Sequence, residues 1–168
     1  KSPLQFRDKG NDISRWIDHL RSLGLPGQAI AIEITEGLLL DASKTVTDKL
    51  LEFRDAGIEV SLDDFGTGYS SLSYIKKFDV DNIKIDQSFV RSLKAGSEDL
   101  AVCEAIIVMA HKLGLKVVAE GIETNEQRAL LASAGCDYGQ GSLFSMPLPE
   151  EEFSALLSSK EVTEEVAI

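Results

Sequence analysis

Two adjacent aspartates, Asp63 and Asp64, directly follow a short apolar run at residues 58–62 and precede a glycine-rich stretch at residues 66–68. Paired carboxylates at a strand end are unfavourable unless a cation, a shared proton or hydrogen bonds compensate their charge. This pattern favours a metal site. The same residues also fit an acidic strand end followed by an ordinary turn, because aspartate and glycine are common in turns.

Three further charged residues lie in or just after apolar runs that are expected to be strands, and they are Glu33, Lys84 and Glu120. Together with the aspartates, the glutamates offer oxygen ligands only, which suit magnesium, manganese or calcium rather than zinc or copper. Two such ions close together can stabilise the attacking and leaving oxygens of a phosphoryl transfer. Lys84 then either supports that chemistry with its charge or simply pairs with a neighbouring acid such as Asp86.

The remaining candidate residues give weaker signals. Glu36 and Glu123 fit either anchors for the segment after the aspartates or plain exposed acids. His19 and His111 fall on expected helices, away from every strand end, and are interpreted as surface or interface residues. The sequence shows no serine or cysteine nucleophile with a partnering histidine, so covalent acyl transfer is disfavoured.

Two short motifs that belong to other enzyme classes are rejected. Asp64-Phe65-Gly66 matches the magnesium motif of protein kinases, but the Val-Ala-Ile-Lys and His-Arg-Asp motifs that accompany it are missing from the sequence. Gly66-Thr67-Gly68 lacks the third glycine of a dinucleotide-binding fingerprint. Neither a kinase nor a nicotinamide enzyme is expected.

Apolar strands alternate with amphipathic helices along the chain. Strands are expected at residues 29–34, 58–62, 82–86, 115–119 and 136–144. Helices are expected at residues 11–24, from about residue 43 to 57, around residues 72–78, at residues 98–113 and 124–134, and after Pro149. This order predicts an α/β fold with a parallel sheet, because parallel strands need long connections.

Charged side chains that converge from several strand ends are typical of a (β/α) barrel, whereas an open doubly wound sheet uses one crevice. We therefore expect a TIM-like barrel with about five βα units. A complete eight-stranded barrel takes about 250 residues, so the barrel is expected to be incomplete in this chain.

Composition limits the function further. The chain has 168 residues, of which 43% are apolar and 27% are charged, as in one globular domain. The longest apolar run, residues 105–110, is far shorter than a membrane span. A net charge of −11 argues against binding to nucleic acid polymers or anionic lipid. Cys103 and Cys136 are interpreted as buried, reduced thiols rather than as a disulfide framework. A cytoplasmic location is expected, in a parent protein that another domain could anchor to a membrane.

Six motifs occur in order with coherent spacing: Ser2-Pro3-Leu4-Gln5-Phe6, Glu33-Ile34-Thr35-Glu36, the segment from Asp63 to Leu72, Lys84-Ile85-Asp86, Ala119-Glu120-Gly121-Ile122-Glu123-Thr124, and Gly135-Cys136-Asp137-Tyr138-Gly139-Gln140-Gly141. By these motifs the chain resembles the C-terminal two-thirds of an EAL domain, the bacterial cyclic-di-GMP phosphodiesterase module. The resemblance implies a TIM-like barrel with one antiparallel strand. It also implies hydrolysis of cyclic-di-GMP to linear pGpG, in bacterial signalling that includes biofilm control.

The resemblance further implies two magnesium or manganese ions, with calcium expected to inhibit. Carried over by position, Glu33 and Asp63 would bind the first ion, and Asp63, Asp64 and Glu120 the second. Lys84 would hold the nucleophilic water.

Four more positions match residues with roles in the family. Glu36 and Glu123 would brace the loop after the two aspartates. Asp86 and Gln140 would line the nucleotide site.

The sequence departs from the family pattern in three places. The Glu-Ala-Leu motif and a ligand asparagine are expected upstream of Lys1, and the family usually has a tyrosine near Ser142 and a basic residue near Met146. We interpret residues 1–158 as a partial EAL domain and residues 159–168 as a tail or linker. This fragment alone is expected to be inactive. A possible homodimer and an attached sensory or GGDEF domain are expected, and the alternative function is a degenerate domain that senses cyclic-di-GMP without cleaving it.

Overall fold

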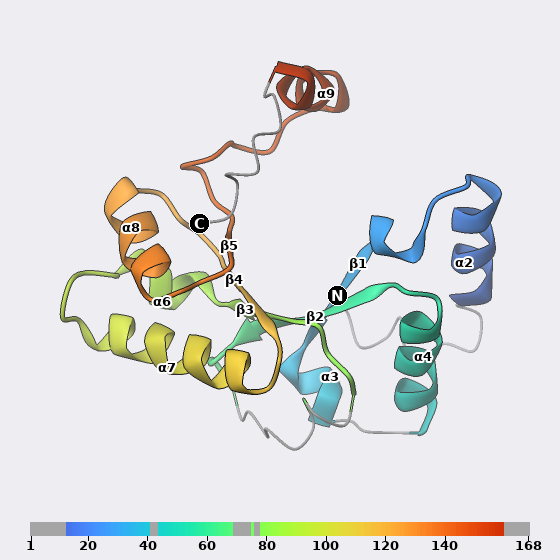
Figure 1. The fold of residues 1–168 in the computed structure, drawn as a ribbon, viewed down its shortest axis with the longest axis horizontal. Coiled ribbons are helices and arrows are strands. Elements are labelled where there is room, and N and C mark those ends of the chain that lie inside the picture. The colour runs from blue at the N-terminus through green and yellow to red at the C-terminus, as the bar shows by residue number, and fades with distance from the viewer. Residues whose placement is uncertain (1–12, 41–43, 69–74, 76–77, 160–168) are drawn as a thin grey trace. The chain divides into compact units, whose positions relative to one another are not determined.

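The computed structural model describes residues 13–40, 44–68, 75 and 78–159 (Figure 1). The chain forms two compact units, Lys1–Lys84 and Ile85–Ile168. The first unit contains α2 (Ile13–Ser22), the 3-10 helix η1 (Gly27–Ala29), β1 (Ala31–Thr35), α3 (Glu36–Leu40), α4 (Lys44–Asp55), β2 (Glu59–Phe65) and most of β3 (Asn82–Ile85). The second contains α6 (Gln87–Arg91), α7 (Glu98–Lys112), β4 (Lys116–Ala119), α8 (Asn125–Ser133), β5 (Tyr138–Gly139) and α9 (Glu150–Ser159).

The strands follow the hydrogen-bonded order β1-β2-β3-β4-β5, which is also their order in the chain. Strands β1 and β2 are parallel, with Ala31 opposite Glu59 and Thr35 opposite Asp63. Strands β4 and β5 are also parallel, with Val118 opposite Tyr138. The predicted α/β fold with a parallel sheet is therefore confirmed.

The core of the first unit forms where α3 and α4 pack on the strands. Ile32 and Ile34 of β1 are buried, while Glu33 between them is partly exposed, as alternation along a strand requires. Helix α4 buries Val46, Leu50 and Phe53, which recur at helical spacing. These apolar contacts fix the strands from which the charged side chains project.

The second unit is built around α7, which packs on β4 and on its neighbours α6 and α8. Ser97 caps this helix, because its side chain accepts a hydrogen bond from the Leu100 amide at 3.2 Å. Its residues Cys103, Ile107 and Ala110 are buried, as the sequence pattern predicts. Strand β4 of this unit therefore packs on a helix with a defined N-terminal cap.

The two strands that bear on the site differ from their predicted lengths. Strand β2 continues through Asp63 and Asp64 to Phe65, whereas a turn was expected to begin at Asp63. Extended pairing was expected over residues 136–144, but β5 contains only Tyr138 and Gly139. Beyond it, the Gln140 amide donates to the carbonyl of Ala119, the last residue of β4, and the Gln140 carbonyl accepts from the Ile122 amide in the loop after β4.

One predicted apolar stripe is only partly buried, and one predicted helix lies mostly outside the described residues. On the stripe expected at residues 11–24, Leu20 is buried but Trp16 and Leu23 are 52% and 58% exposed. The short helix expected at residues 72–78 lies mostly outside the described ranges, although Phe78 is buried. Among the helices that the structure describes, none combines the length and the apolar character that a membrane span requires.

Candidate active site

Three neighbouring strands of the first unit bring charged side chains together at Lys84. The register places Glu33 of β1 opposite Ser61 of β2, and Asp63 lies two residues further along β2, on the same face. Lys84 of β3 lies with its Nζ 2.6 Å from Glu33 Oε1 and 3.3 Å from Asp63 Oδ1. The lysine therefore forms ion pairs with both carboxylates.

The surroundings of these three side chains differ in hydration. The Lys84 side chain is only 6% exposed, whereas the side chains of Asp63 and Glu33 are 20% and 45% exposed. A buried ammonium group loses hydration, and ion pairs with nearby carboxylates offset that loss. Asp63 Oδ1 is buried and accepts no hydrogen bond within the described residues, and the Lys84 ammonium group at 3.3 Å is its ion-pair partner.

Asp64 is the exposed member of the acidic pair. One of its carboxylate oxygens lies within 4.8 Å of one from Asp63, a separation that a shared ion could bridge. Its backbone adopts φ +55°, a left-handed conformation that aspartate tolerates better than most residues. The Thr67 hydroxyl donates a hydrogen bond to the Asp64 carbonyl at 2.9 Å and helps to hold this conformation.

Glu36 contacts the glycine-rich segment that follows the aspartates. Helix α3 begins at Glu36 immediately after β1 ends, and the Glu36 side chain is buried. Its Oε1 accepts a hydrogen bond from the Gly66 amide at 3.0 Å. A side chain at Gly68 would place its Cβ only 2.7 Å from Glu36 Oε2. The carboxylate thus rests directly against this segment.

The second unit holds the other predicted site residues. Glu120 follows β4, and its Oε1 accepts a hydrogen bond from Gln140 Nε2 at 2.9 Å. Asp86 caps α6, because its Oδ1 accepts a hydrogen bond from the Ser88 amide at 2.9 Å. The Glu123 amide donates to Gln127 Oε1 at 2.8 Å, while the Glu123 side chain is exposed. The sequence pattern at Glu120 and Gln140 contains no signal for their direct contact.

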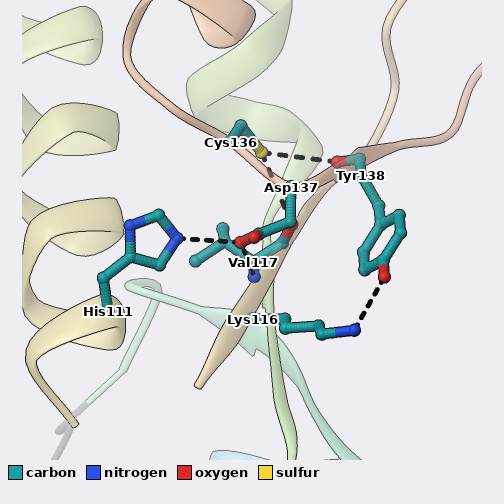
Figure 2. Close-up of polar contacts among 6 residues, drawn as sticks. All are labelled: His111, Lys116, Val117, Cys136, Asp137 and Tyr138. Atoms are coloured by element: carbon teal, nitrogen blue, oxygen red, sulfur yellow. Dashed lines mark hydrogen bonds and ion pairs between the residues drawn. The ribbon is translucent and has the colours of Figure 1, made fainter. Parts of the chain in front are cut away.

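A polar cluster that the sequence did not predict joins α7, β4 and the start of β5 (Figure 2). Asp137 Oδ2 lies 2.8 Å from His111 Nε2 and also accepts a hydrogen bond from the Val117 amide at 2.8 Å. Lys116 Nζ donates to the Tyr138 hydroxyl at 2.9 Å. His111, expected as a surface or interface residue, is exposed but partnered.

Both cysteines of the second unit are buried free thiols, as predicted. Burial raises the pKa of Cys103 to about 11 and that of Cys136 to about 12. The Cys136 thiol also contacts the Tyr138 carbonyl at 3.3 Å. With their pKa values so high, these thiols are not activated nucleophiles.

The family model described as "EAL domain" matches residues 2–147. The chain belongs to the EAL domain family. This EAL domain is 51% identical over 153 residues to the probable cyclic di-GMP phosphodiesterase PdeB of Escherichia coli, covering 91% of the chain and 28% of PdeB. It is 41% identical over 157 residues to the signaling protein YkoW of Bacillus subtilis, covering 93% of the chain and 19% of YkoW. The chain thus spans less than a third of these two curated relatives.

Solved structures agree with the fold of this EAL domain. The EAL domain of Mycobacterium smegmatis DcpA superposes with a TM-score of 0.85 at 37% identity, covering 94% of the chain and 70% of that structure. A structure titled "PaMucR Phosphodiesterase, c-di-GMP complex" gives a TM-score of 0.84 at 35% identity, covering 91% of the chain and 68% of that structure. The predicted EAL-type α/β fold is therefore confirmed.

Proposed function

We propose that this EAL domain hydrolyses one phosphodiester bond of cyclic-di-GMP to give linear pGpG. The observation that carries the proposal is the contact of Lys84 with two carboxylates, Glu33 and Asp63, in a domain of this family. Similarity to the probable cyclic di-GMP phosphodiesterase PdeB and to the PaMucR complex supports the choice of substrate.

Two divalent ions are part of the proposal. Glu33 and Asp63 would hold the first ion, and Asp63, Asp64 and Glu120 would hold the second. These residues offer carboxylate oxygens only, which suit magnesium and manganese. Structures of Klebsiella pneumoniae BlrP1, at 34% identity, are titled as manganese and as calcium complexes with cyclic-di-GMP. We expect magnesium or manganese to support turnover and calcium to inhibit it.

When bound, such ions would activate water and offset negative charge on the phosphate oxygens. Lys84 Nζ would hold and orient the attacking water, because an ammonium group can only donate hydrogen bonds. The Glu36 carboxylate would brace the segment after Asp64 through the Gly66 amide, and Glu123 would assist it.

The nucleotide would meet residues of the second unit. Asp86 and Gln140 are proposed to line its binding site. Gln140 also donates a hydrogen bond to Glu120, so it can orient that carboxylate. All the acids that the family pattern places in this chain are present, which favours hydrolysis over mere sensing of cyclic-di-GMP.

The domain is also proposed to act within a larger cytoplasmic signalling protein. The chain is 39% identical over 160 residues to the oxygen sensor protein DosP of Escherichia coli and spans 20% of that protein. An attached sensory or GGDEF domain and a homodimer belong to this proposal. Light scattering on the full-length protein measures the oligomeric state directly.

The test measures pGpG production by the full-length protein that contains this chain, with magnesium or manganese added. Asp63→Asn keeps the side-chain size but removes a metal-binding charge, so turnover is expected to fall by at least about a hundredfold, the upper end of the loss seen for residues that only orient metal ligands. Asp48→Asn changes an exposed acid of α4 and serves as the matched control. Tight cyclic-di-GMP binding without any pGpG would overturn hydrolysis and indicate a sensor.

A further inference from the structure

The segment that follows Glu120 is held from two sides before α8 begins. Gly121 has φ +72°, and a Cβ there would lie 2.7 Å from Gln87 Cβ at the start of α6. The Ile122 amide donates to the Gln140 carbonyl at 3.1 Å, and the Ile122 carbonyl accepts from the Leu143 amide at 3.0 Å. These contacts fix the first two residues after the proposed metal ligand.

The next two residues are held by one side chain, that of Gln127 in α8. Gln127 Oε1 accepts hydrogen bonds from the amides of Glu123 and Thr124, at 2.8 and 2.9 Å. The Thr124 hydroxyl in turn accepts a hydrogen bond from the Gln127 amide, which completes a capping box. The Oε1 atom of Gln127 thus holds the backbone of Glu123 and Thr124, which lie shortly after Glu120 in the chain.

The other end of the same side chain reaches α6. Gln127 Nε2 donates to the Val90 carbonyl at 3.0 Å and to the Arg91 carbonyl at 3.4 Å. Asp86, the residue proposed to line the nucleotide site, is the N-cap of α6. The Gln127 residue is only 6% exposed, so water cannot readily replace these hydrogen bonds.

Helix capping alone does not explain why residue 127 is a glutamine. A glutamate at this capping-box position would accept the two amide hydrogen bonds equally well. It could not donate to the carbonyls of Val90 and Arg91, because an ionised carboxylate only accepts hydrogen bonds. The NH₂ group of Gln127 therefore serves the connection to α6.

We propose that Gln127 is a positioning residue for the phosphodiesterase reaction, because it connects the segment after Glu120 to α6, the helix that Asp86 caps. The proposal rests on the proposed function of this site. Gln127 touches neither substrate nor metal and acts through the backbone of Glu123 and Thr124. Replacing a side chain that hydrogen-bonds directly to a metal ligand typically changes metal affinity or activity by about 10- to 100-fold, and we take this scale for Gln127.

The experiment compares three variants of the full-length protein. Gln127→Met keeps an unbranched side chain but removes all four hydrogen bonds, and Gln127→Glu keeps only the accepting half. Ser97→Ala, which removes the cap of α7, controls for a general loss of stability. Each variant is assayed for unfolding midpoint, for kcat and KM, for Mn²⁺ binding by calorimetry, and for amide hydrogen exchange at residues 121–124.

We expect Gln127→Met to lower kcat or Mn²⁺ affinity by about 10- to 100-fold, with a smaller change in KM. Exchange at Glu123 and Thr124 should accelerate more than exchange in α7. Gln127→Glu should keep these two amides protected yet still lose activity. Equal kcat, Mn²⁺ affinity and exchange in Gln127→Met and Ser97→Ala, at matched unfolding midpoints, would overturn the positioning role.

The two proposals fail in different ways. A wild-type protein that binds Mn²⁺ but produces no pGpG overturns the proposed function, and Mn²⁺ affinity and exchange then still decide the role of Gln127. A wild-type protein that neither produces pGpG nor binds Mn²⁺ overturns both proposals.

Discussion

The ammonium group of Lys84 and its two carboxylate partners, Glu33 and Asp63, form a charge cluster in the first unit that keeps an excess of negative charge. Lys84 lies 51 positions from Glu33 along the chain, so no local sequence pattern reveals their contact. The strand alternation did predict that the charged side chains leave the isoleucine face. The partners depend on strand order and register, which a single sequence does not contain.

Replacing Lys84 by methionine tests how much these ion pairs contribute to stability. Lys84→Met leaves Asp63 partly buried without its cation, so the free energy of unfolding of the metal-free protein should fall by about 1 to 3 kcal/mol. This loss of stability is smaller than that expected for a fully buried ion pair, because the Glu33 carboxylate remains partly hydrated. Urea denaturation measures it, and saturating Mn²⁺ should restore much of the stability.

Lys94→Met, at an exposed position after α6, is the matched control and should change stability by less than about 0.5 kcal/mol. A Lys84→Met protein as stable as wild type without metal would mean that the ion pairs only offset desolvation.

The two buried thiols predict how stability depends on alkaline pH. Their pKa values are about 11 and about 12 in the folded protein, against an ordinary value of 9.0. The folded state thus holds these protons more tightly than the unfolded state. The contribution of these protons to the free energy of unfolding is fully present below about pH 9. It is lost as the pH rises towards 11, by about 1.4 kcal/mol per pH unit for each thiol.

Denaturation curves between about pH 8 and about pH 11, the range in which cysteine thiols titrate, measure how the free energy of unfolding depends on pH. The double variant Cys103→Ala/Cys136→Ala should be less stable overall but should lack this contribution to the slope. The same slope in both proteins would show that other groups cause the alkaline loss.

At the scale of elements, the sequence predicted helices better than strand ends. The Thr124–Gln127 capping box and the apolar stripe of α7 are local patterns, and both are confirmed. The acidic pair looked like the start of a turn, yet β2 continues through it because β1 pairs with it as far as Asp63. Pairing between distant segments decides strand length, and that information is not local.

Gly141 shows how closely two backbone segments approach beside β5. A Cβ at this position would lie 2.2 Å from the Ile122 carbonyl oxygen and 2.3 Å from its nitrogen. Because both atoms belong to the backbone, Gly141→Ala should cost about 3 kcal/mol or more and should also reduce turnover by displacing the segment after Glu120. Urea denaturation measures the cost.

Gly114→Ala is the control for this substitution. Gly114 has φ +79° and no atom within 4 Å of the added Cβ, so only backbone strain of about 1 kcal/mol is expected. Equal losses in the two variants would show that contact with Ile122 is not the cause.

At the scale of the whole molecule, the net charge of −11 opposes an anionic cyclic dinucleotide. Added salt should therefore speed association by screening this repulsion. We expect the association rate of a fluorescent cyclic-di-GMP to rise about two- to fivefold between about 10 mM and about 150 mM salt. Stopped-flow fluorescence at saturating Mn²⁺ measures it.

An uncharged fluorophore without the dinucleotide controls for salt effects on the signal. A rate that falls with salt would mean that positive groups near the site, Lys84 among them, outweigh the charge of the whole molecule.

Because β1 joins α3 directly, we expect evolution of this sequence to tolerate neither insertions nor deletions between Glu33 and Glu36. Glu33 lies on the strand and Glu36 opens the helix, with no loop residue between the two elements. An insertion after Glu33 would turn the following side chains to the opposite face of the sheet and would move the Glu36 carboxylate away from Gly66. A library of single-residue insertions should therefore show no functional members here, whereas the exposed connection between α6 and α7 should accept them.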